Sequence, residues 1–153
     1  MNRRIAARGI AIDNQGQIFC VRLKAYDNNK ERHFWCLPGG SVDRHETLCD
    51  AVTREIIEET GVLPTLGALL YVHQFVAGRA EHLEFMFHIT NFSDYQDIDI
   101  SKASHADKEI ADFGFVDPKK KVILPRFLST EDITHRIINQ EPTKIFSFLL
   151  RTA

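Results

Sequence analysis

The chain has 153 residues, of which 44 % are hydrophobic and 26 % charged, and its formal net charge at pH 7 is −2. This length suits a single domain, and the composition is that of an ordinary soluble globular protein. A net charge near zero argues against stable nucleic-acid binding, and no apolar run approaches the ~20 residues of a membrane-spanning helix.

The N-terminal segment and the cysteines favour a cytoplasmic protein. The opening stretch MNRRIAARGIAIDNQG is interrupted by Arg8 and Gly9 and lacks the apolar core of a signal peptide, so we expect it to form the first strand. The cysteines, Cys20, Cys36 and Cys49, are odd in number and form no C-x-x-C pair. This usage suits a reducing compartment better than a disulfide scaffold.

Short apolar segments separated by turns make up the first half of the chain. RIAARGIAID and QIFCVRL predict two strands joined by DNQGQ, and HFWCL predicts a short strand that ends at Pro38. A helical pattern then runs from about Thr47 to Thr60, and Gly61 suits the left-handed residue that follows a helix.

The second half begins with two long strands, GALLYVHQFV and HLEFMFHIT, around the turn AGRAE. The second strand alternates. Its apolar face carries Leu83, Phe85, Phe87 and Ile89, and its other face carries His82, Glu84, Met86 and His88. We expect the apolar face to be core and the polar face to meet solvent or a cavity.

A polar loop over 91–108 leads to a predicted strand, DFGFV. The C-terminal segments LPRFLSTEDITHRIINQ and TKIFSFLLRT are predicted to be helical, with Ser129 or Thr130 as a cap. The order of strands and helices predicts an α/β or α+β sandwich with helices packed on a mixed sheet.

Three carboxylates crowd the end of the first predicted helix. On a helical wheel, Glu55, Glu58 and Glu59 share an arc of about 100° that borders the apolar stripe. A solvated acidic face is the simple alternative. However, the helix dipole disfavours negative charge at this end, and Arg54 relieves only part of the repulsion through its i,i+4 partner Glu58. A bound Mg²⁺ or Mn²⁺ would relieve the rest, with a carbonyl of the Gly39–Gly40 turn as one more oxygen ligand.

The stretch from Gly40 to Val62 has a distinctive spacing. Gly40 is followed after five residues by Glu46, and after seven more by Arg54-Glu55-Ile56-Ile57-Glu58-Glu59-Thr60-Gly61-Val62. This stretch resembles the signature of the Nudix hydrolases, G-x5-E-x7-R-E-aliphatic-x-E-E-x-G-aliphatic, and every specified position matches.

The resemblance implies an α/β/α sandwich, with a mixed β-sheet and helices on both faces, formed by one domain over 1–153. It also implies hydrolysis of the pyrophosphate bond in a nucleoside diphosphate linked to another moiety, with Mg²⁺ or Mn²⁺ as the cofactor. By position, the metal ligands would be Glu55, Glu58, Glu59 and the Gly39 carbonyl. Arg54 would orient the carboxylates, and Gly40, Glu46 and Gly61 would be structural.

The general base and the substrate contacts stay open. Glu55 is one candidate base, and Glu109, just before a predicted strand, is another. Glu84 and His82 are candidate pocket residues, and Arg79 and Arg22 are candidate phosphate ligands, with a solvated surface position as the alternative for each arginine.

The expected substrate is a small nucleotide, namely an ADP-ribose-like compound, a nucleotide sugar or a (d)NTP. The alternatives are a Nudix module that senses a nucleotide without cleaving it and an isomerase of an isoprenoid diphosphate. The complete carboxylate set favours the hydrolase, because a sensor has no need of it. Association into a homodimer stays open.

Overall fold

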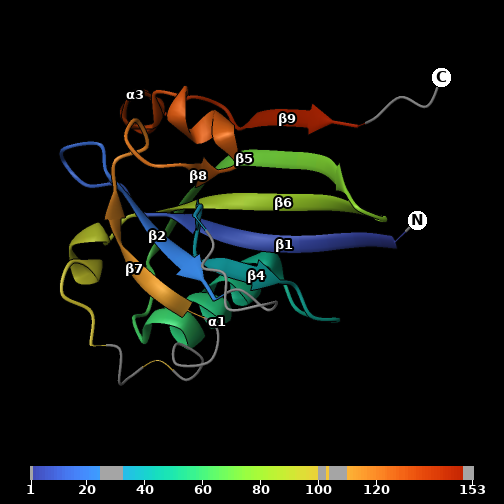
Figure 1. Ribbon diagram of the computed structural model, residues 1–153, viewed down its shortest axis with the longest axis horizontal. Helices are drawn as coiled ribbons and strands as arrows, with labels where there is room; N and C mark the ends of the chain where they lie inside the picture. The colour runs from blue at the N-terminus through green and yellow to red at the C-terminus, as the bar shows by residue number, and fades with distance from the viewer. Residues whose placement is uncertain (1, 25–32, 100–102, 104–109, 150–153) are drawn as a thin grey trace.

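The computed structural model describes residues 2–24, 33–99, 103 and 110–149 (Figure 1). Its strands are β1 (Asn2–Ile10), β2 (Ile18–Leu23), β3 (Trp35–Cys36), β4 (Gly39–Ser41), β5 (Leu66–Ala77), β6 (Ala80–Ile89), β7 (Ile110–Val116), β8 (Ile123–Leu124) and β9 (Lys144–Phe148). Its helices are α1 (Leu48–Thr60) and α3 (Ile133–Ile138), with 3₁₀ turns η1 (Phe92–Tyr95) and η3 (Arg126–Ser129).

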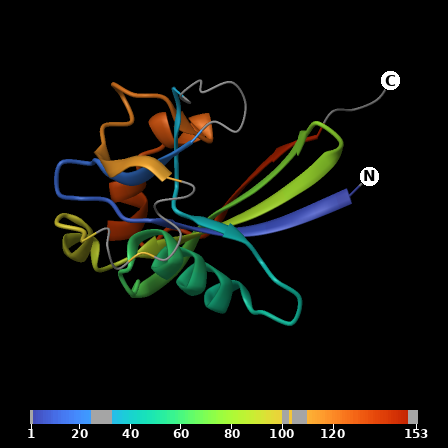
Figure 2. The ribbon, with the colours of Figure 1, turned by 60° about the horizontal axis from the view of Figure 1, so that its bottom comes forward.

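The strands form two mixed sheets. The larger has the order β4-β1-β6-β5-β9, and the smaller has the order β7-β2-β3-β8. In the larger sheet, β1 is parallel to β6 and antiparallel to β4, which sets Arg8 beside Gly39 on one side and Met86 on the other. Figure 2 shows the long strands of this sheet extending beyond the smaller one.

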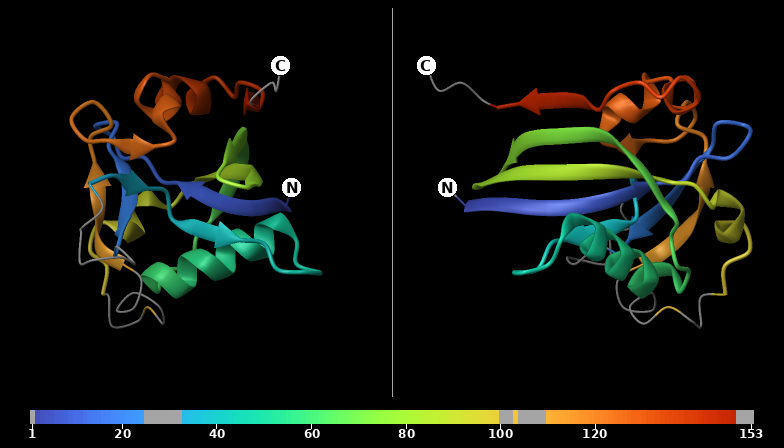
Figure 3. Two further views of the ribbon diagram at one scale, coloured as in Figure 1. Left: turned by 45° about the vertical axis from the view of Figure 1, so that its right-hand side comes forward. Right: turned by 180° about the vertical axis from the view of Figure 1, so that it is seen from behind.

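Strand alternation divides the core into two clusters on opposite faces of the larger sheet. Within β6, Met86 belongs to one cluster, whereas Phe87 and Ile89 belong to the other. Side chains of α1 (Ala51, Val52 and Ile56) fill the second cluster, and those of η3 and α3 (Phe127, Leu128 and Ile133) fill the first. Helices therefore cover both faces, as the left view of Figure 3 shows, and the α/β prediction is confirmed.

Local sequence accounts for the bounds of α1. The Thr47 side chain accepts a hydrogen bond from the Asp50 N–H, and Gly61 closes the helix in the left-handed conformation, with φ of 74°. The close approach of α1 to β1 needs Gly9, because a Cβ there would collide with the side chains of Ile56 and Ile89. Among the described residues, neither helix is long and apolar enough to cross a bilayer.

The prediction for the C-terminal region is wrong in two respects. The segment over 144–148 is strand β9, which adds to β5 in parallel register at the edge of the larger sheet, so it is not helical. A short apolar run of this kind fits either structure by periodicity, and here an available strand edge decides. The cap of α3 is Asp132, which accepts from the His135 N–H at 3.0 Å, and not Ser129 or Thr130.

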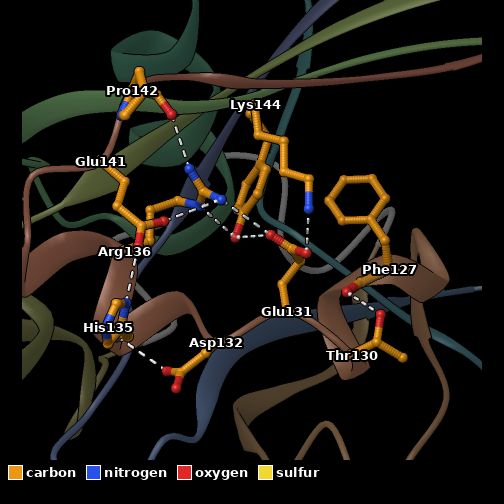
Figure 4. A network of polar contacts seen from close by, with 10 residues as sticks. Phe127, Thr130, Glu131, Asp132, His135, Arg136, Glu141, Pro142 and Lys144 are labelled. Carbon is orange, nitrogen blue, oxygen red and sulfur yellow. Dashed lines mark hydrogen bonds and ion pairs between the residues drawn. The ribbon is translucent and has the colours of Figure 1, made fainter.

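A buried arginine joins α3 to the sheet (Figure 4). Arg136 is 9 % exposed; its Nη1 donates to the Pro142 carbonyl at 2.8 Å and its Nε to the Tyr71 hydroxyl at 3.2 Å. Its Nη2 donates to Glu131 at 3.3 Å, and the other oxygen of Glu131 accepts from Lys144 at 2.8 Å. One guanidinium therefore connects α3, β5 and the segment that enters β9.

Replacement of Arg136 by alanine should destabilise the fold by about 3 kcal/mol, because it removes a buried guanidinium and leaves the partly buried carboxylate of Glu131 and two further acceptors without this donor. Urea unfolding measures the loss, and Arg44→Ala, at an exposed position, serves as the control. A loss below about 1 kcal/mol, in the range of surface ion pairs, would show that the network contributes little.

Candidate functional site

The three carboxylates of α1 meet the chain that enters β4. Glu59 is the most buried of them, at 8 % exposed, and its Oε2 accepts a hydrogen bond from the Gly39 N–H at 3.0 Å. Gly39 has φ of 134°, and a side chain there would collide with the Ala7 carbonyl. Only glycine therefore lets β4 lie this close to β1 while its N–H is turned toward Glu59.

Gly40 makes room for the second carboxylate. A Cβ at this position would lie 2.6 Å from the carboxyl carbon and one oxygen of Glu55. The motif glycine is thus required less for a turn than for the space that the Glu55 carboxylate occupies.

Arg54 holds the acidic groups together. Its Nε and Nη2 bind the two oxygens of Glu46 at 2.7 and 3.0 Å, and Nη2 also donates to the Ser41 carbonyl at 3.1 Å. Its Nη1 donates to Glu55 at 3.1 Å and to Glu58 at 3.2 Å. The hydrogen bond to Glu46 is the main reason why the pKa of Arg54 is raised.

Glu46 is the anchor of this arrangement. The hydrogen bond from Arg54, together with one from the Asp43 N–H at 3.0 Å, lowers the pKa of Glu46 to about 2. The bidentate pair fixes the guanidinium, so that its remaining nitrogen faces the α1 carboxylates. Glu46 acts here as a positioning group.

The donor chemistry of this cluster fits a hard divalent cation. The Glu55 and Glu58 side chains are 20 % and 25 % exposed, so their carboxylates are sheltered and still accessible. Within the described residues, no three His, Cys, Asp or Glu side chains surround one point closely enough to hold an ion as they stand. One oxygen of each carboxylate accepts from Arg54 or from the Gly39 N–H, so a cation would share these carboxylates with the two donors.

A pocket of about 450 Å³ opens on the other face of the larger sheet, beside η3. Its charged and polar lining residues are Arg8, His73, Glu84 and Arg126, and its aromatic ones are Phe75, Phe127 and Phe148. The volume lies in the range of small-molecule sites. Burial lowers the pKa of His73, although nearby Glu84 opposes the shift, so the ring is neutral at pH 7.

Arg8 connects the pocket with the carboxylate helix. Its Nε donates to Glu84 at 3.2 Å, and its Nη1 donates to the Leu37 carbonyl at 3.1 Å, two residues before Gly39. Burial opposes the charge of Arg8, but Glu84 and Glu59 favour it, and its pKa is raised.

Comparison with known proteins decides the family. The model of the NUDIX domain matches residues 2–136. The chain belongs to the NUDIX family. Over 69 residues it is 41 % identical to an ADP-ribose pyrophosphatase of Methanocaldococcus jannaschii. The aligned segment covers 45 % of this chain and 38 % of that protein. Over 52 residues it is 38 % identical to the nucleoside diphosphate-linked moiety X motif 6 protein of Mus musculus. This aligned segment covers 34 % of this chain and 17 % of that protein.

A solved structure supports the fold. The MutT protein of Methanosarcina mazei superposes with a TM-score of 0.63 at 20 % identity, over 93 % of this chain and 97 % of that one. The chain therefore has the NUDIX fold over almost its whole length, whereas its alignments with the two curated relatives span less than half of either protein.

The other residues singled out in the sequence lie in different places around this NUDIX site. Glu84 lines the pocket, whereas the His82 ring stacks on Phe75 at 4.8 Å between centroids and is not among the lining residues. Arg79 is exposed in the turn between β5 and β6, and Arg22 lies 3.8 Å from Asp112 in the smaller sheet. A substrate role for each stays a prediction. Glu109 lies outside the described residues.

The pocket contains two residues that sequence reasoning missed, Arg8 and His73. Both lie on strands next to apolar neighbours, where they look like interruptions of a core strand. A signal was present, because Arg8 lies between Ala7 and Gly9 in a segment whose pattern predicts burial, and a buried arginine needs a partner. The partner, Glu84, is 76 residues away, and only the fold brings the two together.

The depressed pKa of Glu46 makes a pH-dependent contribution to stability. A carboxylate whose pKa is lower in the folded state stabilises the fold above its usual value, and loses that effect as the pH falls toward its folded value. Glu46→Gln should therefore lower the urea midpoint at pH 7, and the difference from wild type should shrink from about pH 4.5 toward pH 2. A difference that stays constant down to pH 3 would contradict the pairing with Arg54.

Proposed function

We propose that the protein hydrolyses the pyrophosphate bond of a nucleoside diphosphate linked to another moiety, with Mg²⁺ or Mn²⁺ as the cofactor. The observation that carries the proposal is the grouping of Glu55, Glu58 and Glu59 at the end of α1 beside Gly39 and Gly40. Arg54 binds Glu55 and Glu58, and the Gly39 N–H binds Glu59. The names of the two curated relatives, a pyrophosphatase and a nucleoside diphosphate-linked moiety X protein, support the same chemistry.

The chain supplies the cation ligands and their orientation. The ligands would be Glu55, Glu58, Glu59 and the Gly39 carbonyl; a bound Mg²⁺ or Mn²⁺ would neutralise the phosphate charge and make water a better nucleophile. Arg54 keeps the carboxylates in place before substrate arrives. This preorganisation matters because phosphoryl transfer depends chiefly on positioning and electrostatics.

Glu55 is the described residue best placed to accept the proton of the attacking water. Its carboxylate lies beneath Gly40, contacts Arg54 at 3.1 Å and keeps access to solvent. Glu109 remains the other proposed base, at a position outside the described residues.

The substrate class follows from the two parts of the site. The carboxylate helix serves the diphosphate, and the aromatic pocket on the other face of the larger sheet has room for the rest of a nucleotide. ADP-ribose-like compounds, nucleotide sugars and (d)NTPs are therefore the proposed substrates. We place the reaction in the cytoplasm, because Cys20, Cys36 and Cys49 form no disulfide in the described part of the chain.

A substrate panel with Mg²⁺ and Mn²⁺, scored for release of phosphate, pyrophosphate and nucleoside monophosphate, tests this function. On the best substrate, Glu58→Gln and Glu59→Gln should each lower kcat at least about a hundredfold, because each removes one charged oxygen ligand. Glu81→Gln, on a strand away from α1, is the control. Full turnover in both variants would refute the metal-site assignment, and tight nucleotide binding without any product would favour a sensor.

Gly40→Ala should separate catalysis from stability. The added Cβ meets the end of the flexible Glu55 side chain, which can rotate away, so the melting temperature should change little. The displaced carboxylate should lower kcat by about 10- to 100-fold, as misplacement by about 1 Å does elsewhere. Ser41→Ala, at the next position of β4, is the matched control; a Gly40→Ala enzyme with normal kcat would show that the position of Glu55 is unimportant.

A further inference from the structure

The floor of the aromatic pocket carries an unusual set of polar atoms. Glu84, 8 % exposed, uses Oε2 to accept from Arg8, and among the described residues no partner binds its Oε1. His73 lies opposite Glu84 in the register of β5 and β6 and is 7 % exposed. Its Nδ1 is the one buried side-chain nitrogen or oxygen without a hydrogen-bond partner in the described part of the chain. Buried polar groups are normally satisfied, so the Nδ1 of His73 points to a ligand, and Glu84, which lines the same pocket, has Oε1 available to bind it.

Aromatic rings surround this floor. The His73 ring stacks on Phe75 at 4.4 Å between centroids and meets Phe127 and Phe148 edge-on at 5.3 and 5.7 Å. Aromatic side chains bind the flat face of a nucleobase by stacking, whichever base it is. The aromatic side chains therefore favour binding of a planar ring without selecting one base over another. Selectivity among bases would come from the polar groups at the bottom of the pocket.

We propose that this pocket holds the base of the nucleotide substrate, and that Glu84 selects bases with an exocyclic amine. This inference rests on the proposed function and adds the base preference to it. The free oxygen of Glu84 accepts from the amine, and the guanidinium of Arg8 donates to the neighbouring ring nitrogen. Adenine and cytosine each present such a pair, an amine beside an unprotonated ring nitrogen.

The same arrangement rejects the oxo counterparts. Hypoxanthine and uracil carry a carbonyl oxygen where adenine and cytosine carry the amine, and a carboxylate has no hydrogen to give to it. Two acceptors then face each other in a buried site, and a site built to bind one hydrogen-bond pattern discriminates strongly against its inverse.

Arg8 relates the base to the reacting bond. The same guanidinium that contacts Glu84 also donates to the Leu37 carbonyl, close to Gly39 and its Glu59 partner. A base on the pocket floor therefore lies one side chain away from the loop that approaches the carboxylates, so the diphosphate of the same molecule can reach α1.

Binding of nucleoside monophosphates tests the preference without turnover, because they contain no pyrophosphate bond. Calorimetry should show that AMP binds at least about tenfold more tightly than IMP, and CMP than UMP, as expected for a hydrogen bond to a charged group. In Glu84→Gln both ratios should fall below about three, since the amide can rotate to donate to a carbonyl. Glu81→Gln, three residues earlier on β6, should keep the wild-type ratios.

The outcomes separate the inference from the proposed function. Equal binding within both pairs in the wild-type protein overturns the inference, whatever the variants do, and so do unchanged ratios in a Glu84→Gln protein that melts normally. If the ratios behave as expected but no diphosphate substrate is cleaved, the proposed hydrolase fails and the base preference stands.

Discussion

The guanidinium of Arg54 donates to Glu46, Glu55, Glu58 and the Ser41 carbonyl at the same time. Without these bonds, the carboxylates at the end of α1 would repel one another and would oppose the helix dipole. These hydrogen bonds join the loop that follows β4 to the last turns of α1 and hold them in a fixed relative position. The geometry of the candidate site therefore depends on a single cation that the chain itself supplies, and that a divalent ion would supplement.

The larger sheet separates the two tasks of the protein. One face carries α1, and the other carries the C-terminal helical segments (Figure 3). The carboxylates lie on α1, and the aromatic pocket lies beside η3. The two sides meet where β4 pairs with β1, because Arg8 lies opposite Gly39 there and reaches both Glu84 and the Leu37 carbonyl. A short edge strand built on two glycines thus brings the proposed chemistry and the proposed recognition within reach of one substrate.

Sequence reasoning was most reliable where the signals are local. The bounds of α1 follow from Thr47 and Gly61. Strand alternation placed Phe87 and Ile89 on a core face of β6, but the opposite face, which carries Glu84, is core as well, because Met86 is fully buried there. Sequence reasoning failed over 144–148, because a short apolar run has the same pattern in a helix and in a strand. The residues of that segment do not show that an edge of β5 is available for pairing. It also failed for the cap of α3, where several neighbouring polar residues could serve and Asp132 does.

The sequence by itself determined the carboxylate set and its spacing, because a helix places residues at fixed angles and the glycines mark where the backbone must come close. It therefore determined the family and the chemistry that the family implies. Only the tertiary structure decided the pocket, since Arg8, His73 and Glu84 come from three strands and their contacts depend on register. A helix is fixed by neighbours in the chain, whereas a sheet is fixed by which distant segments pair, and the residues that would read the substrate lie on the sheet.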